Sequence, residues 1–428
     1  MKPQRKINPW VWIPSLYFVE GLPNVAVVSM SVILYKNLGM SNADIAFYTG
    51  LLYWPWVIKP VWSPFIDLIR NKRWWIVAMQ LLLGAGLIGI AFGIPTRFYV
   101  RFTLAFFWLV AFSSATHDIA ADGFYLLGLN DKQQSFFVGI RSVFYKAATI
   151  FGSGALVYLA GKLSKSTENV PYAWSITFLI MGGLILLFGL YHQRQLPHPE
   201  QDVPQKQMQA KEVWYQFLLT FAAFFKKKHV IRAIFFLLTF RFAEAQLLKL
   251  IQPFLLDARE AGGLGLSTED VGLIYGVYGV IGLTLGGLLG GFAAVRGGLK
   301  RWLWPMLLSM LLTCIVFVYL AYYQTDNWFV INLCVVVEQF GYGFGFTAYM
   351  LFMMQFSKGE YPSAHYAICT GIMAAGMMLP GMFAGKIEER LGGYLPFFIY
   401  VMICSIVPVI SAILLKIDDD SPQSISAH

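Results

Sequence analysis

The sequence predicts an all-α membrane protein with twelve transmembrane helices in two six-helix bundles. Apolar segments of about 20 residues or longer follow one another from Trp10 to about Leu415, and a helix of that length crosses a hydrocarbon core about 30 Å thick. The 428 residues are 57% hydrophobic and 13% charged, whereas about a quarter of a soluble domain is charged. One polar stretch, 191–229, separates six apolar segments from the next six.

The predicted spans follow in chain order, and each is a continuous apolar run. In the first half they cover residues 10–35, 44–69, 74–94, 98–129, 136–161 and 171–190. In the second half they cover residues 230–256, 269–295, 302–323, 327–356, 362–388 and 394–416. The predicted domains are therefore a first bundle at 1–190, a charged linker at 191–229 and a second bundle at 230–428.

The basic residues of the loops predict that both termini are cytoplasmic. Near the span ends, about 18 Lys and Arg residues lie on the side of the termini and about 8 on the other side, and the richer side faces the cytoplasm. The net charge of +9 reflects these loops, so no nucleic-acid partner is expected. The expected surrounding is a lipid bilayer, and the expected state is a monomer.

Several chemistries have no signal in the sequence. The cysteines lie in apolar segments without paired spacing, so neither a disulfide framework nor a metal site is predicted; they are Cys314, Cys334, Cys369 and Cys404. A Gly-x-x-x-x-Gly-Lys-Ser/Thr phosphate loop is absent, which argues against an ATP-driven pump. No polar stretch is long enough for a catalytic domain. We therefore expect a protein that is not an enzyme and has no cofactor.

Two acids in the fourth span are the predicted proton-coupling residues. Asp118 and Asp122 are four residues apart, hence about 40° apart around a helix. A charge near the bilayer centre is costly, so such residues usually face an aqueous cavity or a partner. Two neighbouring acids repel when both are ionised, which favours the binding of a proton by one of them. In the alternative interpretation, each acid pairs with a base and only joins helices.

The first span carries a polar stripe that is predicted to contact a substrate. Glu20 and Asn24 share this stripe, and Gly21 and Pro23 lie beside Glu20. Such residues permit a local break in the helix at a depth where exposed backbone groups must line a cavity. Glu20 is therefore expected either to line a cavity or to balance the charge of Lys59.

Two lysines complete the predicted substrate contacts of the first half. Lys59 lies in a Pro-containing span that is expected to be kinked, and it either contacts the substrate or extends to the membrane surface. Lys146 lies on a polar stripe of the fifth span and is expected to contact an anionic substrate or to neutralise an acid of the fourth span. Arg141 points away from Lys146 and is equally well explained as a loop anchor.

The seventh and tenth spans supply the predicted substrate contacts of the second half. Arg241 and Glu244 share one side of the seventh span, with Lys249 a little further round the helix. Arg241 and Glu244 are three residues apart and can pair, but a pair exposed to lipid is costly, so a cavity-facing position is expected. Tyr342 lies on a polar face of the tenth span, with Glu338 one turn before it.

The halves share a short basic loop after their second span. Asp67, Arg70 and Arg73 occupy this region in the first half, and 296–301 is its counterpart in the second half, with Ala294 near the expected place of the acid. The loops resemble the motif of the major facilitator superfamily, in which an Asp and nearby Arg residues latch helix ends together. The resemblance implies two six-helix bundles and a conformational latch at Asp67, Arg70 and Arg73.

Motifs in spans 1, 2 and 4 give a more specific resemblance. They are Glu20-Gly21-Leu22-Pro23, then Lys59-Pro60-Val61-Trp62-Ser63-Pro64-Phe65-Ile66-Asp67, and then Ala115-Thr116-His117-Asp118-Ile119-Ala120-Ala121-Asp122-Gly123. They resemble the AmpG-like muropeptide permeases, of the peptide, acetyl-CoA and drug transporter family within that superfamily. His117 stands where the family usually has Gln.

This resemblance implies a proton-coupled symporter. Its substrate would be an anhydro-muropeptide, a cell-wall fragment that bears a disaccharide, imported together with protons across the bacterial inner membrane. Another cargo of the same broad family, such as a siderophore or an acyl-CoA, is the first alternative. A membrane-embedded enzyme that acts on lipid-linked sugars is the second alternative, and it requires an acid/base cluster at one interface rather than charges spread over both halves.

Overall fold

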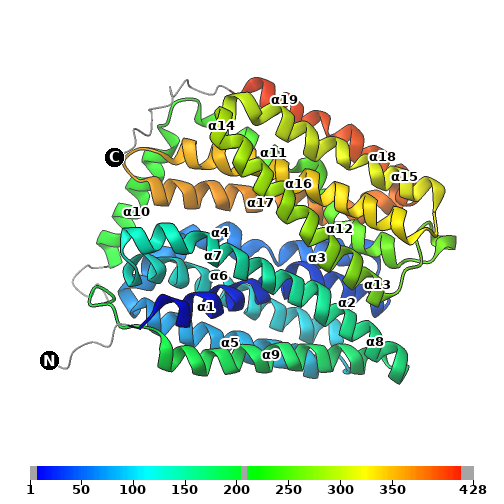
Figure 1. Ribbon diagram of the computed structural model, residues 1–428, viewed down its shortest axis with the longest axis horizontal. Coiled ribbons are helices and arrows are strands. Elements are labelled where there is room, and N and C mark those ends of the chain that lie inside the picture. Colours follow the sequence, from blue (N-terminus) through cyan, green and yellow to red (C-terminus); the bar gives the residue numbers. More distant parts are fainter. Residues whose placement is uncertain (1–6, 204–209, 416–428) are drawn as a thin grey trace.

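The computed structural model describes residues 7–203 and 210–415, and these residues form helices joined by short connections, without a strand among them. The helices run along the long axis of the molecule in two layers (Figure 1). Helices α1–α9 form one layer and α11–α19 form the other. The predicted all-α membrane fold with two helical halves is confirmed in this respect.

The first half contains three helical segments that are interrupted or distorted along their length. Its elements are α1 (Pro9–Val25), η1 (Ala26–Met30), α2 (Ser31–Asn37), α3 (Asn42–Leu51), α4 (Trp54–Ile69), α5 (Lys72–Gly93), α6 (Tyr99–Gly128), α7 (Asp131–Thr149), η2 (Ile150–Leu156), α8 (Val157–Thr167) and α9 (Val170–Gln195). The segments η1 and η2 are π-helical turns, a distortion that is frequent at functional sites.

The second half has the same character, with a third π-helical turn, η4. Its elements are α11 (Val230–Thr239), α12 (Phe242–Leu256), η3 (Arg259–Ala261), α13 (Thr268–Leu273), η4 (Ile274–Gly279), α14 (Val280–Thr313), α15 (Ile315–Tyr323), α16 (Trp328–Ser357), α17 (Pro362–Leu391), α18 (Tyr394–Cys404) and α19 (Ile406–Leu414).

Nine helical segments of the described residues are long and apolar enough to cross a membrane. One of them, Thr268–Tyr323, covers two predicted spans, and the chain changes direction inside it at Gly298, whose φ of 64° favours glycine. Two further predicted spans, 44–69 and 230–256, each consist of two consecutive helices, α3 with α4 and α11 with α12.

Short polar residues fix where many of these helices begin. Each accepts a hydrogen bond from a free backbone N–H of the first turn. These caps are Asn8, Ser41, Asn71, Asn130, Asn169, Ser267 and Asn327. The capped helices therefore start at positions that local sequence specifies.

Two expected helix distortions lie at other positions than predicted. Span 1 remains α-helical through Gly21 and Pro23 and widens only afterwards, at Ala26–Met30. Span 2 is interrupted before Trp54, and α4 then runs from Trp54 to Ile69. Pro55 explains the second case, because proline fits the first turn of a new helix, where its missing N–H has no partner to lose.

Helix α10 (Ala210–Phe225) lies within the segment that the sequence treats as a linker. It stands at one end of the molecule (Figure 1) and contacts both α4 of the first half and α17 of the second. The buried His365 of α17 lies with its Nε2 3.2 Å from the Thr220 carbonyl oxygen of α10. This end is called the α10 end below.

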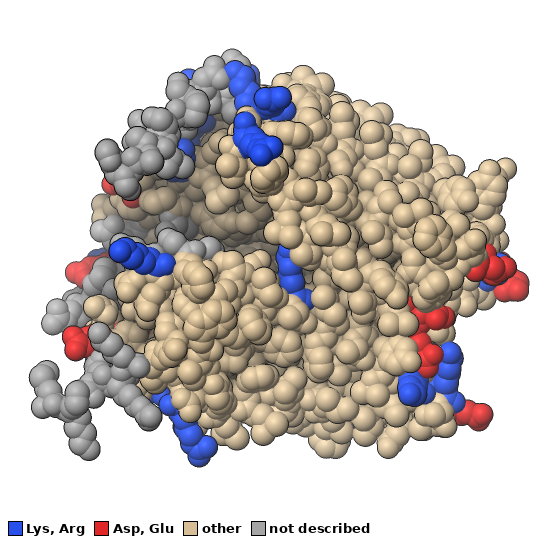
Figure 2. All heavy atoms as spheres, in the orientation of Figure 1, with Lys and Arg blue, Asp and Glu red and all other residues tan. Residues whose placement is uncertain are grey.

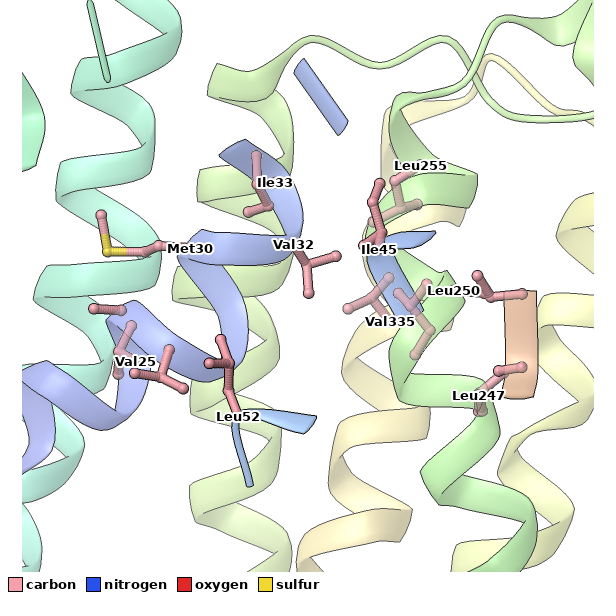
Figure 3. Packing of buried hydrophobic residues seen from close by; sticks show 14 of the residues in the cluster. Val25, Met30, Val32, Ile33, Ile45, Leu52, Leu247, Leu250, Leu255 and Val335 are labelled. Carbon is pink, nitrogen blue, oxygen red and sulfur yellow. The ribbon is translucent and has the colours of Figure 1, made fainter. Parts of the chain in front are cut away.

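The halves meet near the opposite end, through an apolar core. Ile45 of the first half lies beside Leu255 of α12, and Val32 points toward them (Figure 3); all three belong to one buried apolar cluster that also contains Ile33 and Leu250. Buried apolar area of this kind contributes about 25 cal/mol per Å². The halves are therefore held together by packing as well as by polar contacts.

Polar contacts close the same end, which we call the α2 end. Lys36 Nζ lies 2.6 Å from Asp257 Oδ1, and Asn42 Nδ2 donates to Glu388 Oε2 and Tyr394 OH at 3.2 and 2.8 Å. At the α10 end, in contrast, the surface is hollowed between the halves (Figure 2). The figure also shows charged side chains gathered toward the two ends, with a largely uncharged belt between them, as a membrane requires.

Candidate functional site

The first predicted proton-coupling acid, Asp118 of α6, is held by α4. Lys59 Nζ lies 3.5 Å from Asp118 Oδ2, and Trp56 Nε1 donates to the same oxygen at 3.2 Å. The side chains of Lys59 and Asp118 are 26% and 17% exposed. Because the pair is partly accessible, a proton can reach Asp118 and take the place of Lys59 as its positive partner. A fully sealed pair would not allow this.

The second acid, Asp122, pairs with Arg141 of α7. Arg141 Nη2 lies 3.1 Å from Asp122 Oδ1, and Arg141 Nη1 donates to Tyr17 OH at 3.1 Å. The guanidinium also stacks over the rings of Tyr17 and Tyr125, 4.7 and 5.1 Å from their centroids. Arg141, and not Lys146, is therefore the base of α7 that pairs with a span 4 acid, and its alternative role as a loop anchor is wrong.

Glu20 of α1 lies beside Asp118 at the same depth. One carboxylate oxygen from each acid and one ring nitrogen of His117 lie within 4.8 Å of one another. Glu20 Oε2 is buried and has no hydrogen-bond partner, and Lys59 pairs with Asp118 rather than with Glu20. The ammonium of Lys59 already supplies the positive charge at this cluster, so the residues fit proton binding better than a metal cation.

The second half contributes a buried ion pair at the break between α11 and α12. Arg241 Nε and Nη2 donate to Glu244 Oε2 and Oε1 at 2.6 and 2.8 Å. Arg241 Nη2 also donates to Tyr342 OH at 2.9 Å, and the guanidinium stacks on the rings of Tyr342 and Phe346. A bidentate pair of this kind has fixed geometry as well as strength. The predicted pairing of Arg241 with Glu244 is present, and Tyr342 joins it.

Lys249 of α12 reaches across to the first half. Its ammonium donates to Thr49 Oγ1 of α3 at 3.0 Å and lies 5.1 Å from the ring centroid of Tyr53. Nearby, Gln252 Nε2 donates to Ser29 Oγ at 2.6 Å. These contacts place Lys249 at the boundary between the halves without a carboxylate partner among the described residues.

The other predicted contacts are less constrained. Lys146 is half-buried, and a Cβ built on Gly287 of α14 would lie 4.0 Å from its Nζ, so the lysine of one half reaches a helix of the other. Asn24 is partly exposed in α1. Glu338 is buried in α16, where its Oε2 accepts from Gln339 Nε2 at 2.8 Å. Lys146 thus approaches the second half from α7.

The predicted latch residues lie at the α10 end. Arg73 Nε donates to the Leu196 carbonyl oxygen at 3.3 Å, and the backbone N–H of Arg73 donates to Asp202 Oδ2 at 3.0 Å. Arg70 is exposed, with its guanidinium 5.9 Å from the ring centroid of Trp74. Asp67 lies in α4, but its side chain falls outside the described residues. Arg73 thus ties the start of α5 to the end of α9 and to the linker.

Sequence reasoning missed several residues that the fold brings to the site. Trp56 contacts Asp118, and Gln80 and His192 extend a hydrogen-bonded chain behind His117. The sequence singles out Arg141 but does not predict its pairing with Asp122. The only sequence signal for Gln80 and His192 is that a polar residue in an apolar span needs a partner.

An apolar pocket of about 270 Å³ also lies among α4, α5 and α6, lined by residues such as Trp62 and Phe112. None of the charged residues described above lines this pocket.

Comparison with known proteins agrees with this architecture. A Haemophilus influenzae protein is 26% identical over 395 residues, which cover 88% of this chain and 87% of the relative. The anhydromuropeptide permease of Escherichia coli K12 is 22% identical over 383 residues, which cover 88% of this chain and 74% of the permease. The predicted resemblance to muropeptide permeases is thereby confirmed.

Solved structures show the same fold. The crystal structure of the nucleoside transporter NupG superposes with a TM-score of 0.68 at 17% identity, over 95% of this chain and 98% of that one. The family model described as Major Facilitator Superfamily matches residues 15–385. Both this family and the named relatives are transporters, which removes the enzyme alternative. The chain belongs to the major facilitator superfamily of transporters.

Proposed function

We propose that this protein is a proton-coupled symporter that imports anhydro-muropeptides across the bacterial inner membrane by alternating access. The named Escherichia coli relative is an anhydromuropeptide permease, which supports the cargo class. The expected cargo combines sugar rings with a peptide that bears carboxylates. Such a cargo requires cationic groups and aromatic faces in one cavity.

One observation carries this proposal: cations of both halves lie along a boundary that is sealed at one end and hollowed at the other. Lys146 reaches toward α14, and Lys249 crosses to α3. Arg241 lies beside Tyr342 at a helix break. Carboxylates of a peptide would bind these cations, and the neighbouring tyrosine rings would stack on the sugars.

Proton coupling is assigned to Asp118 and Asp122. Each acid has its own base, Lys59 for Asp118 and Arg141 for Asp122. When the acid binds a proton, it loses its charge and releases the base. When the base moves away from the acid, binding of a proton by the acid becomes more favourable. Rearrangement of the helices that carry the two partners is thereby linked to proton uptake, which symport requires.

Cargo binding to the purified protein tests the proposal. An anhydro-muropeptide at about 100 times its Kd is expected to stabilise the protein by about 2.7 kcal/mol, read as a rise in melting temperature in detergent. Lys249→Met should remove most of this rise, whereas Lys165→Met, at an exposed lysine, should leave it intact. A rise produced by a siderophore or by acetyl-CoA instead would assign the other cargo of the same broad family.

The proposed orientation predicts that the linker is cytoplasmic. In Gln201→Cys, with the native cysteines replaced, an impermeant maleimide added to intact spheroplasts should leave the new thiol unlabelled, because the membrane separates the two. Labelling should follow once the membrane is permeabilised. Efficient labelling of intact spheroplasts would show that 191–229 lies outside the cell.

The contacts at the α2 end predict a gate. In Lys36→Met, Asp257 loses its cationic partner, so the closed arrangement at this end should become less populated. Ala46 is buried on the face of α3 that carries Asn42 and Gly50, both of which meet α17. Labelling of Ala46→Cys from the periplasm should therefore become several times faster. Arg259→Met, which removes an exposed ion pair with Asp326 inside the second half at the same end, is the matched control, and equal rates in all three backgrounds would rule out the gate.

A further inference from the structure

Three buried polar side chains and the partly buried Ser15 form one continuous hydrogen-bonded chain within the first half. Ser15 Oγ lies 2.9 Å from His192 Nε2, and His192 Nδ1 lies 2.9 Å from Gln80 Oε1. Gln80 Nε2 in turn lies 2.9 Å from His117 Nε2. Gln80, His117 and His192 are almost completely buried, at 0–1% exposed. The four residues come from α1, α9, α5 and α6, which pack together in one layer (Figure 1).

The chain ends at the acid cluster. At 1.5 Å per residue, His192 lies about 5 Å from the α10 end of its helix, Gln80 about 12 Å and His117 about 17 Å. A ring nitrogen of His117 and carboxylate oxygens of Glu20 and Asp118 lie within 4.8 Å of one another. Glu20 Oε2 is buried and lacks a hydrogen-bond partner. The cluster therefore holds an acceptor for which a donor is required.

Donor and acceptor chemistry gives the chain a direction. The amide nitrogen of Gln80 can only donate, so His117 Nε2 accepts from it. The amide oxygen can only accept, so His192 Nδ1 carries a hydrogen and donates to it. His192 Nε2 then accepts from the Ser15 hydroxyl. Both imidazoles, when neutral, are thus fixed with their hydrogen on Nδ1, and His117 keeps one N–H donor for use elsewhere.

We propose that this chain holds His117 in one tautomer beside Glu20 and Asp118, as an N–H donor available to either acid once it is ionised, with Gln80 and His192 as the positioning residues. A donor that is held in one tautomer stabilises the ionised acids in an apolar span and so lowers the cost of proton release. The inference rests on the proposed function, because proton-coupled transport requires these acids to release a proton. The inference adds which residues set the pH at which that release occurs.

The other charged groups around the acids do not depend on this chain. Lys59 and the indole of Trp56 contact Asp118 from α4. Arg141 contacts Asp122 from α7. Because these partners remain in place when Gln80 or His192 is changed, a shift in pH dependence after such a change reports on His117 itself.

Substitutions along the chain test the inference through the pH profile of proton-driven uptake. Gln80→Met has nearly the same shape without hydrogen-bonding groups, so His117 can adopt the wrong tautomer, and the midpoint of the profile should rise by about one pH unit, the scale of one hydrogen bond to a charged group. His192→Phe should shift the midpoint in the same direction by less, because it keeps a ring to stack on Phe188 but frees the Gln80 amide to turn over. His117→Leu removes the donor and should also raise the midpoint. His117→Gln should keep the midpoint close to that of the parent protein, because an amide can still donate.

A second measurement does not depend on transport. Nitrogen-15 NMR of histidine-labelled protein, with His117 identified from the spectrum of His117→Gln, should show a neutral ring with its hydrogen on Nδ1. In Gln80→Met the two tautomers should mix. A hydrogen on Nε2 in the parent protein overturns the inference.

The two measurements also separate this inference from the proposed function. If uptake in the parent protein shows a pH midpoint that Gln80→Met and His117→Leu leave unmoved, the inference fails while the symport proposal stands. If the parent shows no proton-driven uptake, the symport proposal fails, and the tautomer of His117 alone decides whether the chain fixes a donor.

Discussion

Asp118→Asn is expected to abolish proton-driven accumulation of cargo while leaving downhill exchange partly intact. The amide keeps the size of the side chain and a contact to Trp56 but can neither bind a transported proton nor release Lys59 through one. A gradient of about two pH units supplies about 2.7 kcal/mol per proton, enough for roughly hundredfold accumulation at one proton per cargo. In the variant, the accumulation ratio should fall to about one.

Asp122→Asn should have the same effect to a smaller degree. The side chain of Asp122 is 48% exposed and that of Asp118 is 17% exposed, so the pair of Asp122 with Arg141 is more strongly screened by water. Glu260→Gln, at an exposed acid in the short helix η3, serves as the control and should accumulate cargo normally. If both Asp variants accumulate cargo with an unchanged pH dependence, these acids are structural, and Glu20 or Glu338 is the next candidate.

Arg241→Met is expected to cause the largest loss of stability of any single change at the site. It leaves the carboxylate of Glu244 buried without its counter-ion, and removal of one partner from a buried pair costs about 3–5 kcal/mol. The double variant Arg241→Met/Glu244→Met should recover most of this stability, because no charge remains unpaired. Melting temperatures in detergent measure both effects.

Cargo binding separates the two roles of this pair. The double variant is expected to fold but to bind cargo at least about tenfold more weakly, a loss of about 1.4 kcal/mol, because the cation beside Tyr342 is gone. Arg259→Met, which removes the partner of the exposed Asp326, is the matched control and should change neither stability nor binding. If the double variant binds cargo as tightly as the parent protein, Arg241 and Glu244 are not substrate contacts.

The fold class was predictable because it follows from the length and order of apolar segments. Each predicted span has a helical counterpart in the described residues, although the caps at Asn71 and Asn130 start their helices at Lys72 and Asp131, ahead of the predicted starts at 74 and 136. The positions of the breaks were not predictable from prolines alone. Span 2 is broken before Trp54, and span 7 is broken at Arg241, which stands between two helices instead of on the face of one.

The candidate site was predictable as a set of charges but not as a set of pairs. A helical stripe shows which residues share a face, and it brought Asp118, Glu20 and Arg241 to attention. It does not show which helix packs against that face. The partners therefore depended on the tertiary arrangement: α4 supplies Lys59 to Asp118, and α7 supplies Arg141 to Asp122. The same reason explains why Lys146 was expected beside the acids.

Helix α10 in the linker was not predicted, because the residues on either side of it are typical of a polar connection. Pro197, Pro199 and the Lys226–Lys228 run mark a polar connection, yet Ala210–Phe225 forms α10, which contacts both halves. Exposed aromatic side chains such as Trp214 and Tyr215 agree with a helix that lies at a membrane interface. Its amphipathic character is visible only when the window excludes the charged ends.

Uptake of radiolabelled anhydro-muropeptide by proteoliposomes, with and without an imposed pH gradient, tests the central claim most directly. Liposomes that contain the parent protein should accumulate the cargo only when the gradient is present, and a protonophore should discharge it. Liposomes with Asp118→Asn should equilibrate the cargo without accumulating it. Gradient-dependent accumulation of a siderophore or of acetyl-CoA in its place, or muropeptide uptake that ignores the gradient, would contradict proton-driven muropeptide import.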